Sequence, residues 1–373
     1  MIRRDAVIVG GGPAGSTCAR VLRTAGWHVI VLDRARFPRD KVCAGWVTPG
    51  VFDALDLDPR EYRDAGLTLQ EISAFRTGLL QGPLLETDYR RVVSYAIRRC
   101  EFDHFLLRRA RVCVREGTPV DSLRRKDDVW IVNDLYEAPV VIGAGGHFCP
   151  VARRLRGPSE AVQPLVAREA EFRIDRAQAA RLPAAPELYF CRDLDGYAWC
   201  VRKGDYVNIG IGRRGREGFA GHVRDFVAFA ARRHGVPAAG VRWKGHAYLA
   251  AGSGARPLVG DGLLLVGDAA GLAYPESGEG IRPAVESGRL AGEVLARTTG
   301  TYLAEDLQPY ADAIAREHPA SVPYRGVARA ISVAAGRLLM RSPAFARHVL
   351  LDRWFLRAPR TAGAPAAQLP FFS

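Results

Sequence analysis

The stretch Asp5-Ala-Val-Ile-Val-Gly-Gly-Gly-Pro-Ala-Gly15 decides the fold of this chain. Its apolar start is typical of a buried parallel strand, and a glycine loop follows without a break. Apolar residues then recur at helical spacing, and a second apolar strand, His28 to Leu32, ends at Asp33. This order of strand, loop, helix, strand and acid predicts a Rossmann-type dinucleotide-binding unit.

Each key position of this unit has an expected task. Gly10 makes the tight turn, Gly12 admits a pyrophosphate to the backbone, and Gly15 lets the helix pack closely. Asp33 accepts a hydrogen bond from a ribose hydroxyl, and the helix N-terminus faces the phosphates. These features do not distinguish one dinucleotide from another.

A second motif far downstream selects FAD over NAD. An apolar strand from Gly262 ends at Asp268, and the segment Pro275–Ile281 leads into a helical pattern that continues to Leu295. A long cofactor needs such a second anchor. Asp268 could bind the ribityl chain, and the Gly280 and Ile281 amides could stabilise negative charge on a reduced flavin. The alternative is an ordinary strand-to-helix turn.

Motifs between residues 5 and 300 occur in a characteristic order. They are the glycine loop with Asp33, Phe37–Gly45, Arg99–Asp103, Val141–Gly146, Tyr197–Trp199, Gly267–Asp268 and Gly278–Ile281. Together they resemble the geranylgeranyl reductase family of FAD-dependent oxidoreductases, within the p-hydroxybenzoate-hydroxylase-like flavoprotein superfamily.

The resemblance implies FAD as the cofactor and assigns it a set of residues. Ala14 and Asp33 would contact the adenosine half, Cys43 and Ala44 the flavin, and Arg99 the phosphates or ribityl chain. Val120, expected in the strand after a helix at 102–111, would contact adenine. The expected cofactor-binding residues are Gly10, Gly12, Pro13, Ala14, Gly15, Asp33, Arg34, Cys43, Ala44, Gly45, Trp46, Arg99, Val120, Asp268, Gly278, Gly280 and Ile281.

The expected catalytic residues are Cys43, Tyr197 and Trp199. Residues two apart in a strand share a face, so Tyr197 and Trp199 can form one aromatic wall beside a substrate. Cys43 could deliver a proton or be an inert buried thiol, and Tyr197 is the other candidate acid. Trp46 either narrows the pocket or simply packs. Arg202 either meets an anionic head group or is a solvated strand end.

The resemblance implies an enzyme that reduces a C=C bond, or otherwise redox-processes an apolar isoprenoid- or polyketide-like substrate. An external donor, NAD(P)H, a ferredoxin or a flavin reductase, would supply electrons. One alternative is a monooxygenase or halogenase acting on an aromatic natural product, although Gly145 stands where such monooxygenases carry an Asp. A second is a flavin-dependent cyclase without net redox chemistry.

Composition limits the remaining classes. The formal net charge is +13, but only Lys41, Lys126, Lys203 and Lys244 are lysines and the arginines form no long run, so we expect no nucleic-acid partner. No Cys-x-x-Cys pair or zinc-finger spacing is present, and we expect no metal or disulfide framework. Without a signal peptide or a spanning segment, a cytoplasmic location is expected.

The fold class predicted is α/β. It comprises a discontinuous Rossmann-type FAD-binding domain, an inserted and mostly antiparallel β-sheet substrate domain, and a C-terminal helical segment. The expected boundaries are 1–60, 92–155 and 256–300 for the FAD-binding domain, 61–91 and 156–255 for the substrate domain, and 301–373 for the helical segment. Basic amphipathic helices at 327–356 either cap a core or rest peripherally on the inner membrane surface.

Overall fold

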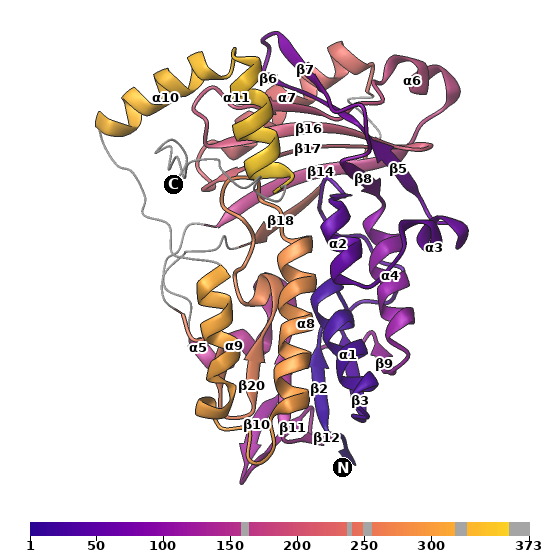
Figure 1. The fold of residues 1–373 in the computed structure, drawn as a ribbon, viewed down its shortest axis with the longest axis vertical. Helices are drawn as coiled ribbons and strands as arrows, with labels where there is room; N and C mark the ends of the chain where they lie inside the picture. Colours follow the sequence, from indigo (N-terminus) through magenta and orange to yellow (C-terminus); the bar gives the residue numbers. More distant parts are fainter. Residues whose placement is uncertain (158–163, 237–240, 249–255, 318–326, 358–373) are drawn as a thin grey trace.

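The glycine loop lies at the end of the central strand of a parallel sheet. The computed structural model describes residues 1–157, 164–236, 241–248, 256–317 and 327–357 (Figure 1). The strand order is β19-β20-β13-β2-β3-β9, and β19 alone among these runs antiparallel to its neighbour. The strands are β2 (Ala6–Val9), β3 (Val29–Asp33), β9 (Cys113–Glu116), β13 (Val140–Gly143), β19 (Val259–Gly260) and β20 (Leu263–Leu265). All of β2 is buried, as expected for a strand covered on both faces.

Helices pack against this sheet and against one another. The helix after the glycine loop, α1, contacts α4 and α8, and α8 contacts α9. Their bounds are α1 (Pro13–Thr24), α4 (Arg99–Ala110), α5 (Pro150–Arg156), α8 (Ile281–Arg297) and α9 (Ala304–Glu317). A small sheet adjoins this half, with strands β1 (Ile2–Arg3), β12 (Tyr136–Ala138), β11 (Val129–Val132) and β10 (Leu123–Lys126).

A second large sheet forms the upper half of the molecule in Figure 1. Its order is β18-β14-β17-β16-β15-β6-β7, antiparallel except where β15 pairs with β6. The strands are β6 (Ala74–Leu79), β7 (Leu84–Asp88), β14 (Leu165–Arg173), β15 (Glu187–Phe190), β16 (Gly196–Lys203), β17 (Tyr206–Arg214) and β18 (Lys244–Tyr248). The predicted α/β class and the mostly antiparallel second sheet are confirmed.

Short elements surround the second sheet. Val223 and Phe226 of α7 (Phe219–His234) pack on Ile209 and Ile211 of β17 in one apolar cluster. Strands β4 (Trp46–Val47) and β5 (Leu69–Ile72) both pair with β8 (Ser94–Ile97) in a separate small sheet. The remaining helices of this part are α2 (Pro49–Ala54), α3 (Pro59–Asp64) and α6 (Arg176–Arg181).

The C-terminal helices pack on the second sheet. They are α10 (Val327–Leu339), α11 (Pro343–Phe345) and a π-helical segment, η3 (Ala346–Phe355). Phe345, Leu350, Trp354 and Phe355 are buried in one cluster with aromatic residues of that sheet, whereas Leu338 is exposed. These four side chains cap a core, so they are not available to a bilayer. No helix in the described ranges is long and apolar enough to cross a membrane.

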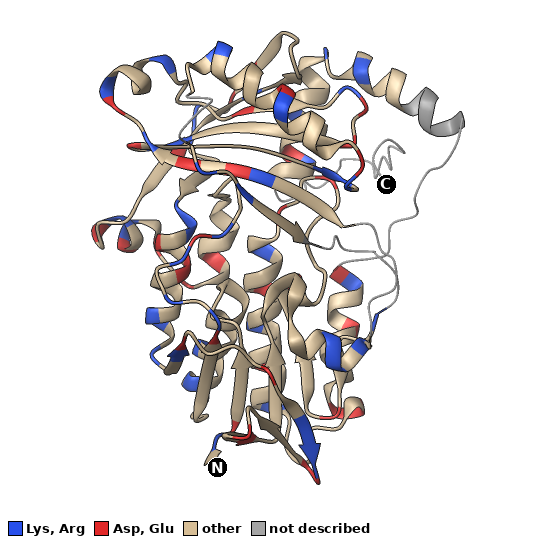
Figure 2. Ribbon diagram, turned by 180° about the vertical axis from the view of Figure 1, so that it is seen from behind, with Lys and Arg blue, Asp and Glu red and all other residues tan. Residues whose placement is uncertain are grey.

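Charged residues are distributed over both halves. Figure 2 shows Lys and Arg interspersed with Asp and Glu in the described part of the chain. The net positive charge is therefore not gathered into one stripe along the elements drawn.

Candidate functional site

The expected site residues surround one cavity of about 630 Å³. Its wall combines the loops after β2 and β3, the N-terminal ends of α1 and α8, residues 39–46, and one face of β16. Every residue expected to bind the cofactor lines it except Gly15, and so do the expected catalytic residues Cys43, Tyr197 and Trp199. Motifs more than 200 residues apart in the sequence therefore meet at one site.

The glycine loop is shaped by close backbone contacts. Gly10 has φ +112°, and a Cβ there would lie 2.4 Å from the Ala144 carbonyl oxygen. A Cβ on Gly15 would lie 2.0 Å from the Gly10 carbonyl oxygen, so this glycine permits the close approach of α1 although it does not reach the cavity. A Cβ on Gly12 would meet only the Arg39 guanidinium within 4 Å. The Gly12 backbone is thus open toward the cavity.

Asp33 stabilises the same loop from the end of β3. Its two carboxylate oxygens accept the Gly11 amide at 2.7 Å and the Ala35 amide at 2.8 Å.

Val120 lies in the loop after β9, so its expected place in a strand is wrong. Strand β9 ends because Gly117 takes φ +65° and the Thr118 amide turns back to the Asp33 carbonyl. Val120 nevertheless lines the cavity.

Two arginines share one carboxylate at the cavity wall. Arg99 is buried and donates to both oxygens of Asp103, at 2.8 and 2.9 Å. Arg39 forms an ion pair with the same carboxylate at 3.1 Å. Two guanidinium groups therefore face one negative charge, which leaves a net positive charge suited to an anion such as a phosphate.

Asp268 belongs to a partly buried ionic cluster that includes Lys41 and His246. The Lys41 ammonium lies 3.3 Å from the Asp268 carboxylate and hydrogen-bonds to the His246 ring. Burial lowers the pKa of Lys41, with Asp268 opposing the change. Burial and Lys41 together lower the pKa of His246 to about 3, so its ring is neutral at pH 7. For Asp268, burial acts to raise the pKa, but Lys41 and His246 outweigh it and lower the pKa.

An aromatic wall closes another side of the cavity. The Tyr197 and Trp199 rings lie 5.9 Å apart on the same face of β16. The centroid of the Phe355 ring lies 5.3 Å from that of Tyr197 and 5.6 Å from that of Trp46. Trp46 both lines the cavity and packs on Phe75, so its two proposed roles coexist.

Arg202 does not reach this wall. It lies an odd number of positions from Trp199 and so projects from the opposite face of β16. Its guanidinium donates to the carbonyl oxygens of Gly204 and Ala179. Of the two alternatives for Arg202, contact with a head group in this cavity is not supported, because Arg202 is not among the residues that line it.

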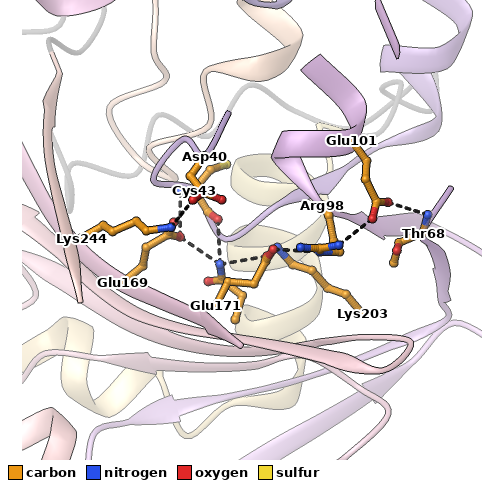
Figure 3. Close-up of polar contacts among 10 residues, drawn as sticks. Asp40, Cys43, Thr68, Arg98, Glu101, Glu169, Glu171, Lys203 and Lys244 are labelled. Carbon is orange, nitrogen blue, oxygen red and sulfur yellow. Dashed lines mark hydrogen bonds and ion pairs between the residues drawn. The ribbon is translucent and has the colours of Figure 1, made fainter. Parts of the chain in front are cut away.

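A polar network adjoins Cys43 (Figure 3). The Glu169 carboxylate accepts the Cys43 amide at 2.8 Å and the Asn208 amide at 2.9 Å. Asn208 accepts the Trp199 indole N–H at 2.7 Å and also donates to the Cys43 carbonyl. Burial raises the pKa of Glu169, although Lys203 and these hydrogen bonds oppose the rise.

The network continues through Glu171 to a buried lysine (Figure 3). The Lys203 ammonium is fully buried and donates to Glu171 at 2.7 Å, and Arg98 donates to the other oxygen of Glu171 at 3.1 Å. Burial acts to raise the pKa of Glu171, but the two cations outweigh it and lower the pKa. A Cβ on Gly45 would lie 2.2 Å from the Lys203 nitrogen, so the network supports the Cys43–Gly45 loop directly.

Comparison with known proteins identifies the family. Residues 5–105 match the protein-family model that is described as FAD dependent oxidoreductase. Digeranylgeranylglycerophospholipid reductase 1 of Methanopyrus kandleri is 31% identical over 325 residues, 78% of this chain and 80% of that protein. The chain belongs to the geranylgeranyl reductase family of FAD-dependent oxidoreductases. The menaquinone reductase of Mycolicibacterium smegmatis, 29% identical, covers 79% of this chain and 76% of its own length.

Solved structures support the fold of this geranylgeranyl reductase family member. A geranylgeranyl bacteriochlorophyll reductase-like protein from Thermoplasma acidophilum superposes with a TM-score of 0.71 at 20% identity, covering 91% of this chain and 88% of that one. The flavin-dependent brominase Bmp2 has a TM-score of 0.66 at 17% identity, with 95% and 92% covered. At these identities the likeness concerns the fold alone. The family assignment makes the chain an oxidoreductase and implies FAD as its cofactor.

The residues present fit FAD. The opening at Gly12, the Asp33 end of β3 and the Arg99–Arg39 pair lie on the same cavity as Cys43–Trp46 and Gly278–Ile281. An extended dinucleotide needs polar and anion-binding groups at one end and room for a ring at the other. The cavity provides both.

Several residues of the site were not anticipated from the sequence. Lys41 and Glu279 stand inside motifs that were recognised, and each carries a charge that could have marked it. Glu169, Asn208 and His246 gave no signal, because they belong to strands in which neither spacing nor motif marks a polar residue that faces the site.

Proposed function

We propose that this chain reduces carbon–carbon double bonds of an isoprenoid chain carried by a lipid, with FAD bound in the cavity. The observation that carries the proposal is the aromatic wall of Trp46, Tyr197, Trp199 and Phe355, which adjoins the Cys43 loop on the same cavity. Its apolar rings suit an unsaturated hydrocarbon. Relatives named as reductases of digeranylgeranylglycerophospholipids and of menaquinone support this substrate class.

We assign cofactor binding to the residues that line the cavity at its other end. Gly10, Gly12 and Pro13 would hold the phosphates at the start of α1. The adenosine half would be bound by Ala14, Asp33, Arg34 and Val120. Arg99 would contribute positive charge. Asp268, Gly278, Gly280 and Ile281 would border the flavin opposite Cys43, Ala44 and Gly45.

Bound FAD supplies the hydride for this reduction. The chain orients the alkene, excludes water and provides the proton for the second carbon. Cys43 and Tyr197 are the proposed donors: the Cys43 sulfur accepts the Gly45 amide at 3.3 Å, and the Tyr197 hydroxyl donates to the Ser277 carbonyl. An external donor, a reduced nicotinamide, a ferredoxin or a flavin reductase, completes the cycle.

The test is product analysis with purified, FAD-loaded protein under argon, with dithionite as reductant. A geranylgeranyl glycerophospholipid is expected to gain two hydrogen atoms for each double bond lost, measured by mass spectrometry. Cys43→Ala and Tyr197→Phe are expected to slow product formation, whereas Cys191→Ala, which changes a buried cysteine that does not line the cavity, serves as the control. Oxygenated product in air, with no hydrogenated product under argon, would instead support a monooxygenase.

A further inference from the structure

Glu279 is a buried carboxyl group that the proposed function does not use. It stands in the Gly278–Ile281 segment that lines the cavity, immediately before Gly280, the N-cap of α8. Both of its carboxyl oxygens are enclosed, and neither meets the geometry of a hydrogen bond with any described residue, although the nearby Arg282 amide acts to lower the pKa of the group. Buried polar groups are nearly always paired, so an unpaired carboxyl beside a functional cavity points to a role there.

The charges that face Glu279 come from three elements. Arg282 and Glu286 lie on α8, Arg357 follows η3, and Tyr274 lies in the preceding loop. Both cations are engaged elsewhere: Arg282 donates to Glu286 at 2.7 Å, and Arg357 donates to Glu276 at 3.1 Å. Neither arginine therefore holds the Glu279 carboxylate in a direct ion pair.

Burial raises the pKa of Glu279 to about 7. Arg282, Arg357 and the Arg282 amide only partly oppose the rise. The group is thus close to half ionised at neutral pH, where a modest change in nearby charge shifts its protonation.

The position of Glu279 couples it to charge in the cavity. The start of α8 is where we place the Gly280 and Ile281 amides against the flavin, so this step rests on the proposed function. A helix N-terminus stabilises negative charge. A carboxylate and a reduced flavin at the same helix end would compete for that stabilisation and repel each other.

We propose that Glu279 takes up a proton when the bound flavin is reduced. An external two-electron reductant is oxidised and delivers two electrons, one proton enters the flavin ring, and the ring gains one negative charge. A second proton, from solvent, binds a carboxylate oxygen of Glu279 and neutralises it. The coupling is reciprocal, so a neutral Glu279 makes the flavin easier to reduce.

A potentiometric titration of FAD-loaded protein without any alkene substrate tests this. Around pH 7 the wild-type midpoint potential is expected to fall more steeply with pH than that of Glu279→Gln. For each pH unit, the reduction equilibria of the two proteins are expected to diverge by up to a factor of ten. This corresponds to a difference of ~30 mV per pH unit between the two slopes for a two-electron couple. Glu293→Gln changes a partly exposed carboxyl on the same helix, bound to Arg289, and is expected to keep the wild-type slope. Parallel slopes for wild type and Glu279→Gln would overturn the proposal.

Infrared difference spectroscopy on the wild-type protein alone covers the case in which Glu279→Gln does not fold. Reduction at neutral pH is expected to produce a new protonated-carboxyl band, and its absence contradicts the proposal. Neither experiment contains a lipid, so alkene reduction can fail or succeed independently. A chain that binds no FAD would instead defeat the proposed function.

Discussion

Asn208 joins two walls of the cavity through a single side chain. Its oxygen accepts the Trp199 indole N–H, and its nitrogen donates to Glu169 and to the Cys43 carbonyl. Because Asn208 is almost fully buried, water cannot replace these bonds without rearrangement. The orientation of Trp199 and the path of the Cys43 loop therefore depend on one amide.

We expect Asn208→Leu to lower the free energy of unfolding by ~3 kcal/mol, since it leaves the Trp199 indole N–H buried and unpaired and removes one of the two hydrogen bonds to the buried Glu169 carboxylate. Denaturant unfolding measures this loss. Gln308→Leu is the control, because Gln308 is exposed and bonds to Asp312; it should change stability by less than ~0.5 kcal/mol. Equal losses in the two variants would show that the network does not stabilise the site.

The raised pKa of Glu279 predicts a pH-dependent stability. The folded protein binds this proton more tightly than the unfolded chain, so the stabilisation is complete below the ordinary pKa of 4.5 and is lost as pH rises through about 7. A shift of this size corresponds to ~3 kcal/mol. The free energy of unfolding of Glu279→Gln, relative to that of wild type, should therefore rise by about this amount between acidic and alkaline pH. A stability difference independent of pH would contradict the raised pKa.

At the scale of elements, α1 and α8 approach closely because α8 carries glycine at the contact. A Cβ on Gly288 would lie 2.2 Å from the Ala14 carbonyl oxygen, and one on Gly292 would lie 2.7 Å from Val21. This contact sets the distance between the N-terminal ends of the two helices, and both ends border the cavity.

Gly288→Ala is expected to lower the free energy of unfolding by ~1–3 kcal/mol or more. The added Cβ would meet backbone atoms of Ala14, which cannot move aside as a flexible side chain can. Thermal unfolding gives the measurement. Gly221→Ala in α7 is the matched control: its Cβ would meet only the end of Arg224 at 3.8 Å, and alanine there should stabilise by up to ~1 kcal/mol. Similar changes in thermal stability for Gly288→Ala and Gly221→Ala would mean that the α1–α8 contact is not tight.

Local patterns predicted most of these elements, and the failures have two causes: a turn that ends a strand early, and contacts between residues far apart in the chain. The strand ending at Asp33 and the helix that begins at Ile281 follow from apolar runs and glycines, which act locally. Val120 was misplaced because the turn at Gly117 ends β9 early. Glu169 contacts Cys43 across 126 residues, and no local pattern encodes such a pairing.

At the scale of the whole molecule, the C-terminal segment completes the cavity. Phe355 is almost fully buried and contacts Trp46, Phe190 and Tyr197. A ring from the far end of the chain thus joins the N-terminal loop to the second sheet.

Phe355→Ala is expected to cost ~3–5 kcal/mol in stability and to raise KM for an apolar substrate more than it lowers kcat, because it opens a void in the cavity wall. Leu338→Ala removes a side chain that is 68% exposed and should leave both quantities near wild type. Unchanged KM in Phe355→Ala would place the substrate elsewhere.

The central claim is that electrons pass from FAD in this cavity to an isoprenoid double bond. Its most direct test is an anaerobic single turnover, in which pre-reduced, FAD-loaded protein is mixed with a geranylgeranyl glycerophospholipid and flavin absorbance is followed. The account predicts that oxidised flavin returns without oxygen, in a one-to-one ratio with double bonds lost. Flavin that stays reduced with this lipid and with menaquinone until air is admitted would contradict it.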